Sequence, residues 1–210
     1  MPWRWNPSAF RYQNVNGSAY FLSHKQVLEW TSESIKSAIS VSDSLSMMVQ
    51  QQLLAPQDWY LIMREEIKRE YIREYMLGIG GQYSMTPADW GSIGGMLKEQ
   101  YGYLENFLND IETMDLTEGQ IMSRAAMYFN SAGEAYERAH GRVAEMWGAV
   151  EEAWNVNPAL ENCDDCLNFE DEGWQSIGYF PVPKQGETQC LTNCGCYITY
   201  MNEEGEEFGG

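Results

Sequence analysis

The five cysteines of this 210-residue chain are the side chains best suited to chemistry, because they gather within 34 residues near its C-terminal end. Cys163 and Cys166 form a CxxC pair, and Cys190, Cys194 and Cys196 follow as a CxxxCxC group. Two close groups of thiolates at opposite ends of a loop are the usual way to supply the four ligands of tetrahedral zinc. The spacing therefore predicts one structural zinc ion.

The identity of the last two zinc ligands is less specific than that of the first two. Cys163 and Cys166 supply one pair of thiolates. For the other pair we favour Cys190 and Cys194, because a CxC pair must bend sharply to place both of its thiolates on one ion. Cys196 is the alternative ligand.

The stretch between the two cysteine groups is too poor in apolar residues to fold without a staple. Its larger apolar side chains, Trp174, Ile177, Tyr179 and Phe180, offer little mass for a core, so a metal or disulfides must add stability. The first residues lack the apolar stretch and cleavage site of a signal peptide. We therefore expect a reducing cytoplasm, which favours zinc; disulfides are the main alternative and free thiols a further one.

A catalytic role for the thiols is not expected, and we predict that the protein is not an enzyme. The two histidines, His24 and His140, lie far from the cysteines along the chain, whereas a nucleophilic thiol needs a base within hydrogen-bond reach. Zinc held by four thiolates has no open position for a catalytic water. The acidic run between Asp164 and Glu172 is typical of a solvated loop.

The elements that must position the cysteines are helices, and their start signals are clear. Ser23 and Thr117 each precede a Gln at capping-box spacing, Thr86 precedes a proline and an acid, and Pro56 suits a first helical position. The Ser-rich stretch 37–46 has low helix propensity, which indicates a break in the first helix.

Apolar residues recur at helical spacing behind these caps. The seam from Trp90 to Ile111 and the seam from Ile121 to Val150 predict two helices packed in antiparallel fashion. The second of them is expected to run from 118 to about 154. The fold class that follows is mainly α, a helical bundle with a small C-terminal, zinc-stabilised, cysteine-rich module.

The chain is expected to divide into four parts. These are an aromatic N-terminal arm (1–22), the helical bundle (23–156), the cysteine-rich module (157–200) and an acidic flexible tail (201–210). Because Trp and Tyr are common interface anchors, the arm is a candidate partner-binding segment. Its candidate residues are Trp3, Trp5, Phe10, Tyr12, Tyr20 and Phe21. The alternative is that the arm folds back to cover the bundle.

The charge of the chain argues against direct, sequence-specific nucleic-acid binding. The formal net charge is −18. Residues 151–210 hold 13 acidic side chains against one basic side chain, Lys184, whereas phosphate neutralisation needs clustered Lys and Arg. No stretch of 18 apolar residues is present, so no membrane-spanning segment is expected.

Between Cys163 and Cys196 the motifs follow in a fixed order: CxxC, aromatic residues, a Pro-x-Pro loop and C…NCxC. This order resembles the C-terminal end of tailed-phage head morphogenesis, or minor head, proteins of the Mu type. The segments 58–64, 80–91 and 100–104 also resemble phage structural proteins with this ending. In the Mu-type pattern a His-Pro often precedes the final CxC, and Cys190 stands in that area here.

The resemblance implies a structural virion component that acts in head assembly or stabilisation. Its expected partners are capsid or portal subunits, contacted in multiple symmetric copies, and its expected location is the virion after synthesis in the host cytoplasm. The alternative function is a free zinc-containing acidic binding or inhibitor protein that acts in the host cell.

Overall fold

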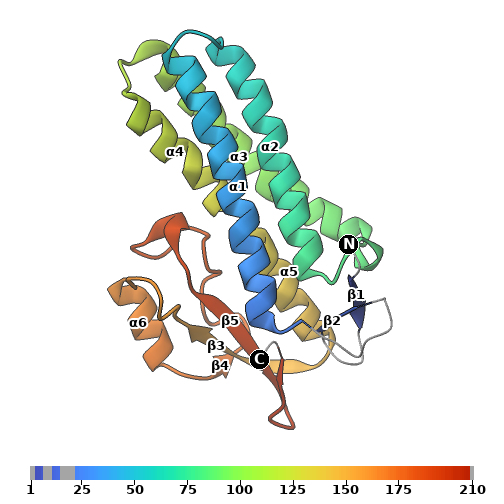
Figure 1. Cartoon of the computed structure of the whole chain (residues 1–210). Helices are drawn as coiled ribbons and strands as arrows, with labels where there is room; N and C mark the ends of the chain where they lie inside the picture. Colours follow the sequence, from blue (N-terminus) through green and yellow to red (C-terminus); the bar gives the residue numbers. More distant parts are fainter. Residues whose placement is uncertain (1–2, 7–10, 15–21, 209–210) are drawn as a thin grey trace.

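The computed structural model describes residues 3–6, 11–14 and 22–208, and it is mainly helical with a small sheet at the C-terminal end (Figure 1). Three long helices, α1 (His24–Gln50), α2 (Pro56–Gly78) and α3 (Pro87–Thr113), form a bundle with two shorter ones, α4 (Glu118–Asn130) and α5 (Gly133–Met146). The predicted fold class, a helical bundle with a C-terminal cluster of cysteines, is confirmed. None of the described helices combines the length and apolar character needed to cross a membrane.

The helices begin where the capping signals place them. The Ser23 and Thr117 hydroxyls accept hydrogen bonds from the backbone N–H groups of Gln26 and Gln120, and each Gln side chain returns to the cap. Asp89 does the same for Thr86 at the start of α3, with its carboxylate 2.7 Å from the Thr86 backbone nitrogen. These reciprocal bonds satisfy backbone donors that a helix leaves unpaired at its first turn.

The core of the bundle lies along α2. Its four-residue stripe, Trp59, Met63, Ile67 and Tyr71, is fully buried. Phe107 of α3 meets the Trp59 ring edge-on at 5.4 Å between centroids. Such pairs of buried aromatic rings add to the stabilisation that apolar burial gives the bundle.

The packing expected between the Trp90–Ile111 seam and the Ile121–Val150 seam is only slight: α3 touches α4 through side chains and makes few backbone contacts with α5. Phe107 of α3 stacks on Tyr128 of α4 with centroids 6.4 Å apart. In backbone terms α4 packs chiefly on α1, and α5 packs chiefly on α2. The register of the α3 seam also differs at its start, because Trp90 is 47% exposed while Leu104 is fully buried.

Two helix predictions were wrong. The Ser-rich stretch does not break α1, which is continuous, because Ser42 and Ser46 point into the protein and are buried there. The helix expected from 118 to about 154 is instead α4, α5 and a strand. α4 and α5 are separated at Ser131, whose hydroxyl bonds back to the Tyr128 carbonyl at 3.0 Å, a contact that bends helices.

The strand that replaces the end of the expected helix is β3 (Ala149–Asn155), the centre of the C-terminal sheet. The strand order is β4-β3-β5-β6, all antiparallel, with β4 (Gln175–Ser176), β5 (Tyr197–Asn202) and β6 (Glu207–Phe208). The segment expected to be a flexible tail therefore contributes strand residues up to Phe208. Pairing with a distant strand overrides the local helical spacing of residues 149–155.

The N-terminal segment forms a hairpin of β1 (Trp3–Asn6) and β2 (Arg11–Asn14). Tyr12 is buried against Leu22, Val27 and Tyr136, and its hydroxyl donates to the Leu77 carbonyl at 2.7 Å. Tyr12 is thus a core side chain, as the fold-back alternative expects. Among the other candidate anchors, Trp3 and Trp5 lie in β1, while Phe10, Tyr20 and Phe21 lie outside the described residues.

Candidate metal centre

The five thiols are delivered by two short elements that meet beside β3. Cys163 is the N-cap of α6 (Asp164–Asp171), which places Cys166 in its first turn. The second group lies on the loop through the 3-10 turn η2 (Leu191–Asn193), and Cys196 directly precedes β5. Beneath them Trp154 of β3 packs on Phe169 and Phe180, with ring centroids 5.2 and 6.1 Å away. This small aromatic core fixes α6 against the sheet.

Cys166 lies at the centre of the thiol cluster. Its sulfur is 3.4 Å from that of Cys163, 3.7 Å from that of Cys190 and 3.7 Å from that of Cys194. Sulfurs bound tetrahedrally at about 2.3 Å to one zinc ion would lie about 3.8 Å apart. The cluster is therefore compact enough to hold a metal ion.

The sulfurs fall into two groups that share Cys166. One group is Cys163, Cys166 and Cys190, and the other is Cys166, Cys194 and Cys196; within each, all sulfurs lie within 4.8 Å of one another. The Cys196 sulfur also lies 3.8 Å from the Asn162 side-chain oxygen. All five predicted candidates are thus brought together, and both Cys194 and Cys196 are near enough to Cys166 to serve as ligands.

The five cysteines are free thiols in this structure. Their shortest sulfur–sulfur distance among the hydrogen-bonded pairs, 3.4 Å, is far longer than the 2.0 Å or so of a disulfide bond. No histidine, aspartate or glutamate joins either thiol group in the described part of the chain. The ligand chemistry on offer is consequently that of sulfur alone.

Burial and crowding act against ionisation of most of these thiols. Burial raises the pKa of Cys166 far above its ordinary value and that of Cys190 to about 11. For Cys194, hydrogen bonding to Cys196 is the main cause of a raised pKa, followed by burial. Because several thiolates repel one another in one small space, they can all be ionised together only around a cation.

Cys163 differs from the other thiols, since its pKa is lowered. Burial acts to raise it, but hydrogen bonds from the backbone and side chains of Cys166 and Cys190 more than offset that effect. Backbone N–H donors stabilise a thiolate in the way that outer groups commonly support metal ligands. Cys163 therefore ionises more readily than an ordinary cysteine.

Polar contacts outside the thiols join the two elements. The Asp165 carboxylate of α6 accepts hydrogen bonds from the backbone and side chain of Gln189, at 2.8 and 3.0 Å. The Thr188 hydroxyl lies 3.2 Å from the Cys190 sulfur. At Gly195 a β-carbon would overlap with the end of the Leu160 side chain, which would have to move to make room.

Lys184 links the loop before the second cysteine group to α5, a role that the sequence did not reveal. Its side chain lies over Gly133, where a β-carbon would overlap with it, and its ammonium is 3.9 Å from the buried Glu137 carboxylate of α5. Lys184 also has a positive φ of 68°, which is uncommon for a side chain of this kind. The only signal available was that it is the single basic residue after position 150.

The histidines do not take part in the thiol cluster. His140 of α5 stacks on Tyr136 at 5.6 Å between ring centroids and faces Tyr200 of β5 at 5.4 Å. The side chain of His24 lies outside the described part of the structure. His140 therefore helps to pack the sheet on the bundle.

Comparisons with protein-family models, with curated proteins and with solved structures give no match to this chain.

Proposed function

We propose that the cysteine cluster binds one structural zinc ion and that the protein is a non-enzymatic structural component of a tailed-phage virion, bound at the capsid or portal vertex. The observation that carries the metal part of this proposal is the spacing of 3.4–3.7 Å between the Cys166 sulfur and three others. The virion part is supported by the motif order in Cys163–Cys196, which resembles that of Mu-type minor head proteins.

Zinc suits this cluster better than harder cations do. Soft thiolate ligands select zinc and similar metals, whereas magnesium and calcium prefer oxygen. Cys166, Cys194 and Cys196 are buried, which leaves little room for the open, water-bearing position of a catalytic zinc site. A closed thiolate site supports a structural role for the ion.

The position of the cluster indicates what the zinc would stabilise. β5 begins directly after Cys196 and carries Tyr200, whose hydroxyl lies so close to Gly141 of α5 that a β-carbon there would crowd it. Lys184 reaches Glu137 of the same helix. Zinc would therefore fix α6 and β5 together, and β5 in turn would fix the sheet on the bundle, giving one rigid body for assembly contacts.

The metal content of the purified protein tests the first part. Protein prepared without chelators should contain about one zinc per chain by elemental analysis. Cys166→Ser should abolish zinc binding, whereas Leu167→Ser, an exposed neighbour on α6, should leave it unchanged. Wild-type protein that lacks zinc and contains intramolecular disulfides would contradict the proposal.

The composition of phage particles tests the second part. Mass spectrometry of gradient-purified particles should find the chain in a fixed, symmetric ratio to capsid or portal subunits. A chain that is absent from particles and free in the lysate would contradict the virion role. That result would favour the alternative of a free zinc-containing acidic binding protein in the host cell.

A further inference from the structure

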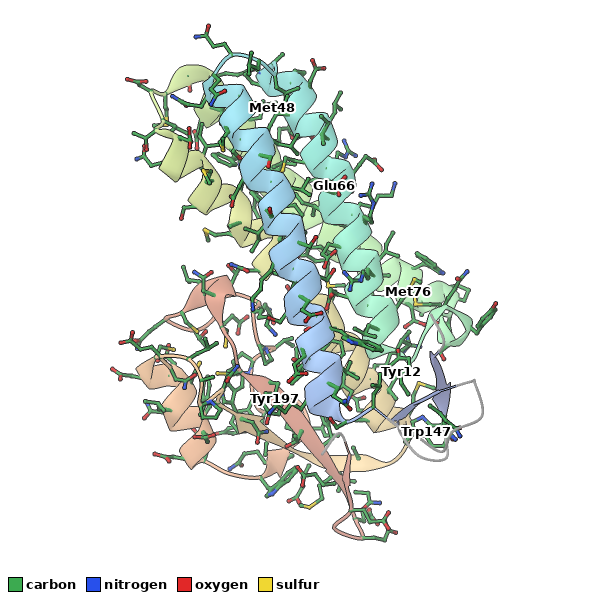
Figure 2. All side chains as sticks on the ribbon, in the orientation of Figure 1. Tyr12, Met48, Glu66, Met76, Trp147 and Tyr197 are labelled. Carbon is green, nitrogen blue, oxygen red and sulfur yellow. The ribbon has the colours of Figure 1, made fainter. Side chains whose placement is uncertain are left out.

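The thiol cluster holds one cysteine more than a tetrahedral zinc ion needs. Its two three-sulfur groups are Cys163, Cys166 and Cys190, and Cys166, Cys194 and Cys196. Tetrahedral zinc takes four thiolates and leaves the fifth cysteine without a ligand role. As two sites that share Cys166, the groups use all five. Figure 2 labels Tyr197, the residue directly after Cys196, at the sheet end of the molecule where the cluster lies.

The spacing within each group suits an ion bound by three sulfurs. Three sulfurs that surround one ion in a plane at about 2.3 Å lie about 4.0 Å apart. In the first group the Cys166 sulfur is 3.4 Å from that of Cys163 and 3.7 Å from that of Cys190. In the second group it is 3.7 Å from that of Cys194. Every pair of sulfurs within a group lies within 4.8 Å, so small side-chain adjustments would close both sites.

Cys166 is the side chain placed to bridge two ions. Its sulfur belongs to both groups, and a thiolate sulfur has enough lone pairs to bind two metal ions at once. Cys163 is the N-cap of α6 and Cys166 lies in its first turn, where the positive end of the helix dipole favours thiolates. The Thr188 hydroxyl lies 3.2 Å from the Cys190 sulfur and can donate a hydrogen bond to its thiolate.

The ligands identify the kind of ion that two such sites would take. In the described part of the chain both groups consist of sulfur alone, and soft thiolates select copper(I) as well as zinc. Copper(I) is commonly bound by three thiolates, whereas structural zinc is almost always bound by four ligands. Cys166, Cys194 and Cys196 are buried, which keeps water from the ions and leaves sulfur as their ligand.

We propose that the cysteine cluster is also a binuclear copper(I) site, in which each three-sulfur group holds one copper(I) ion and Cys166 bridges the two ions. Two copper(I) ions carry the same total charge as one zinc ion. Loading of the zinc form therefore releases one Zn²⁺ and, from the thiol that zinc leaves uncoordinated, one proton. This second occupancy goes beyond the proposed zinc role and depends neither on it nor on the virion role.

Anaerobic titration of the full chain with copper(I), supplied as its acetonitrile complex, measures the number of sites. A copper(I) chelator removes loosely held ions, and elemental analysis after gel filtration should find two copper ions per chain and no zinc. Cys190→Ser and Cys196→Ser each disable one group, so each should lower the end point to one copper. Leu191→Ser is the matched control, because Leu191 is exposed on the same loop and carries no thiol, and it should still bind two.

X-ray absorption of the copper-loaded wild type tests the bridge without any substitution. It should show three sulfur neighbours for each copper and scattering from a second copper, because both ions bind the Cys166 sulfur. A wild-type end point of one copper, or of two without copper–copper scattering, overturns the proposal. So does a Cys196→Ser chain that still binds two copper ions.

Zinc analysis of the same preparation before titration separates this proposal from the zinc proposal. A chain that contains one zinc and takes up only one copper overturns the binuclear site and leaves the zinc role standing. A zinc-free chain that takes up two copper ions supports the binuclear site and counts against the zinc role alone.

Discussion

Glu74 lies near the end of α2 and is completely buried. Burial, with a smaller contribution from the neighbouring Glu70, raises the pKa of its carboxyl group to about 8, although Arg73 and Lys184 act in the opposite direction. The folded protein therefore prefers Glu74 in its protonated form. The unfolded chain would ionise it near 4.5, so the stability that this preference gives is present below that pH and is lost as the pH rises towards 8.

The magnitude follows from the two pKa values. One pKa unit corresponds to about 1.4 kcal/mol, so a rise from 4.5 to about 8 lowers the free energy of unfolding by about 5 kcal/mol once the pH exceeds 8. The same relation gives about 3 kcal/mol at pH 7 and about 2 kcal/mol at pH 6. Glu74→Gln keeps the shape of the protonated side chain and has no charge to bury, so it should remove this loss.

Urea unfolding of wild type and Glu74→Gln at pH 6, 7 and 9 measures the effect. The variant should be the more stable at each pH, and its advantage should grow by about 3 kcal/mol from pH 6 to pH 9. Glu65→Gln is the control, because Glu65 is exposed on the same helix and pairs with Lys68, 3.2 Å away, at the surface. An advantage of Glu74→Gln that does not change with pH, or a variant less stable at pH 9, would refute the reasoning.

Three shorter predictions address packing and ligands. Leu104→Ala should lower the free energy of unfolding by about 2–5 kcal/mol, and Trp90→Ala by less than about 1 kcal/mol, because only Leu104 is fully buried. Asp89→Ala should lower the free energy of unfolding by about 3–5 kcal/mol, because the buried Asp89 carboxylate accepts hydrogen bonds from Tyr75, Thr86 and Arg142. Chemical denaturation measures the changes in stability of the Leu104, Trp90 and Asp89 variants. If Cys194 is the fourth ligand, Cys194→Ser should abolish zinc binding and Cys196→Ser should leave it intact. Elemental analysis of the two purified variants decides between these ligands.

The helix starts could be predicted because their signals are local. In a capping box the hydrogen bonds join a Ser or Thr to a Gln or Asp three residues later, so they depend little on the rest of the fold. The structure has these bonds at Ser23, Thr86 and Thr117. The gathering of the cysteines was equally predictable, since both a metal site and disulfides would bring thiols at such spacing together.

The parts that could not be predicted depend on residues far apart in the sequence. The apolar residues of β3 have helical spacing, but the segment forms a strand because it pairs with β5. β5 begins more than 40 residues later, so local spacing gives no sign of this pairing. Gly133 shows no local reason to be glycine until Lys184 is placed over it. The choice between Cys194 and Cys196 likewise depends on how the loop bends, which spacing alone does not specify.

The pairing of β3 with β5 has a consequence for the order of folding. Asn155 pairs with Tyr197, and all five thiols lie on the segment between them. Closing a segment of about 40 residues costs an entropy that grows with the logarithm of its length, and this cost slows the search for the correct strand partner. A metal ion bound by thiols from both ends of the segment would bring the strands together before they pair. Zinc supply during synthesis would then control when the sheet forms.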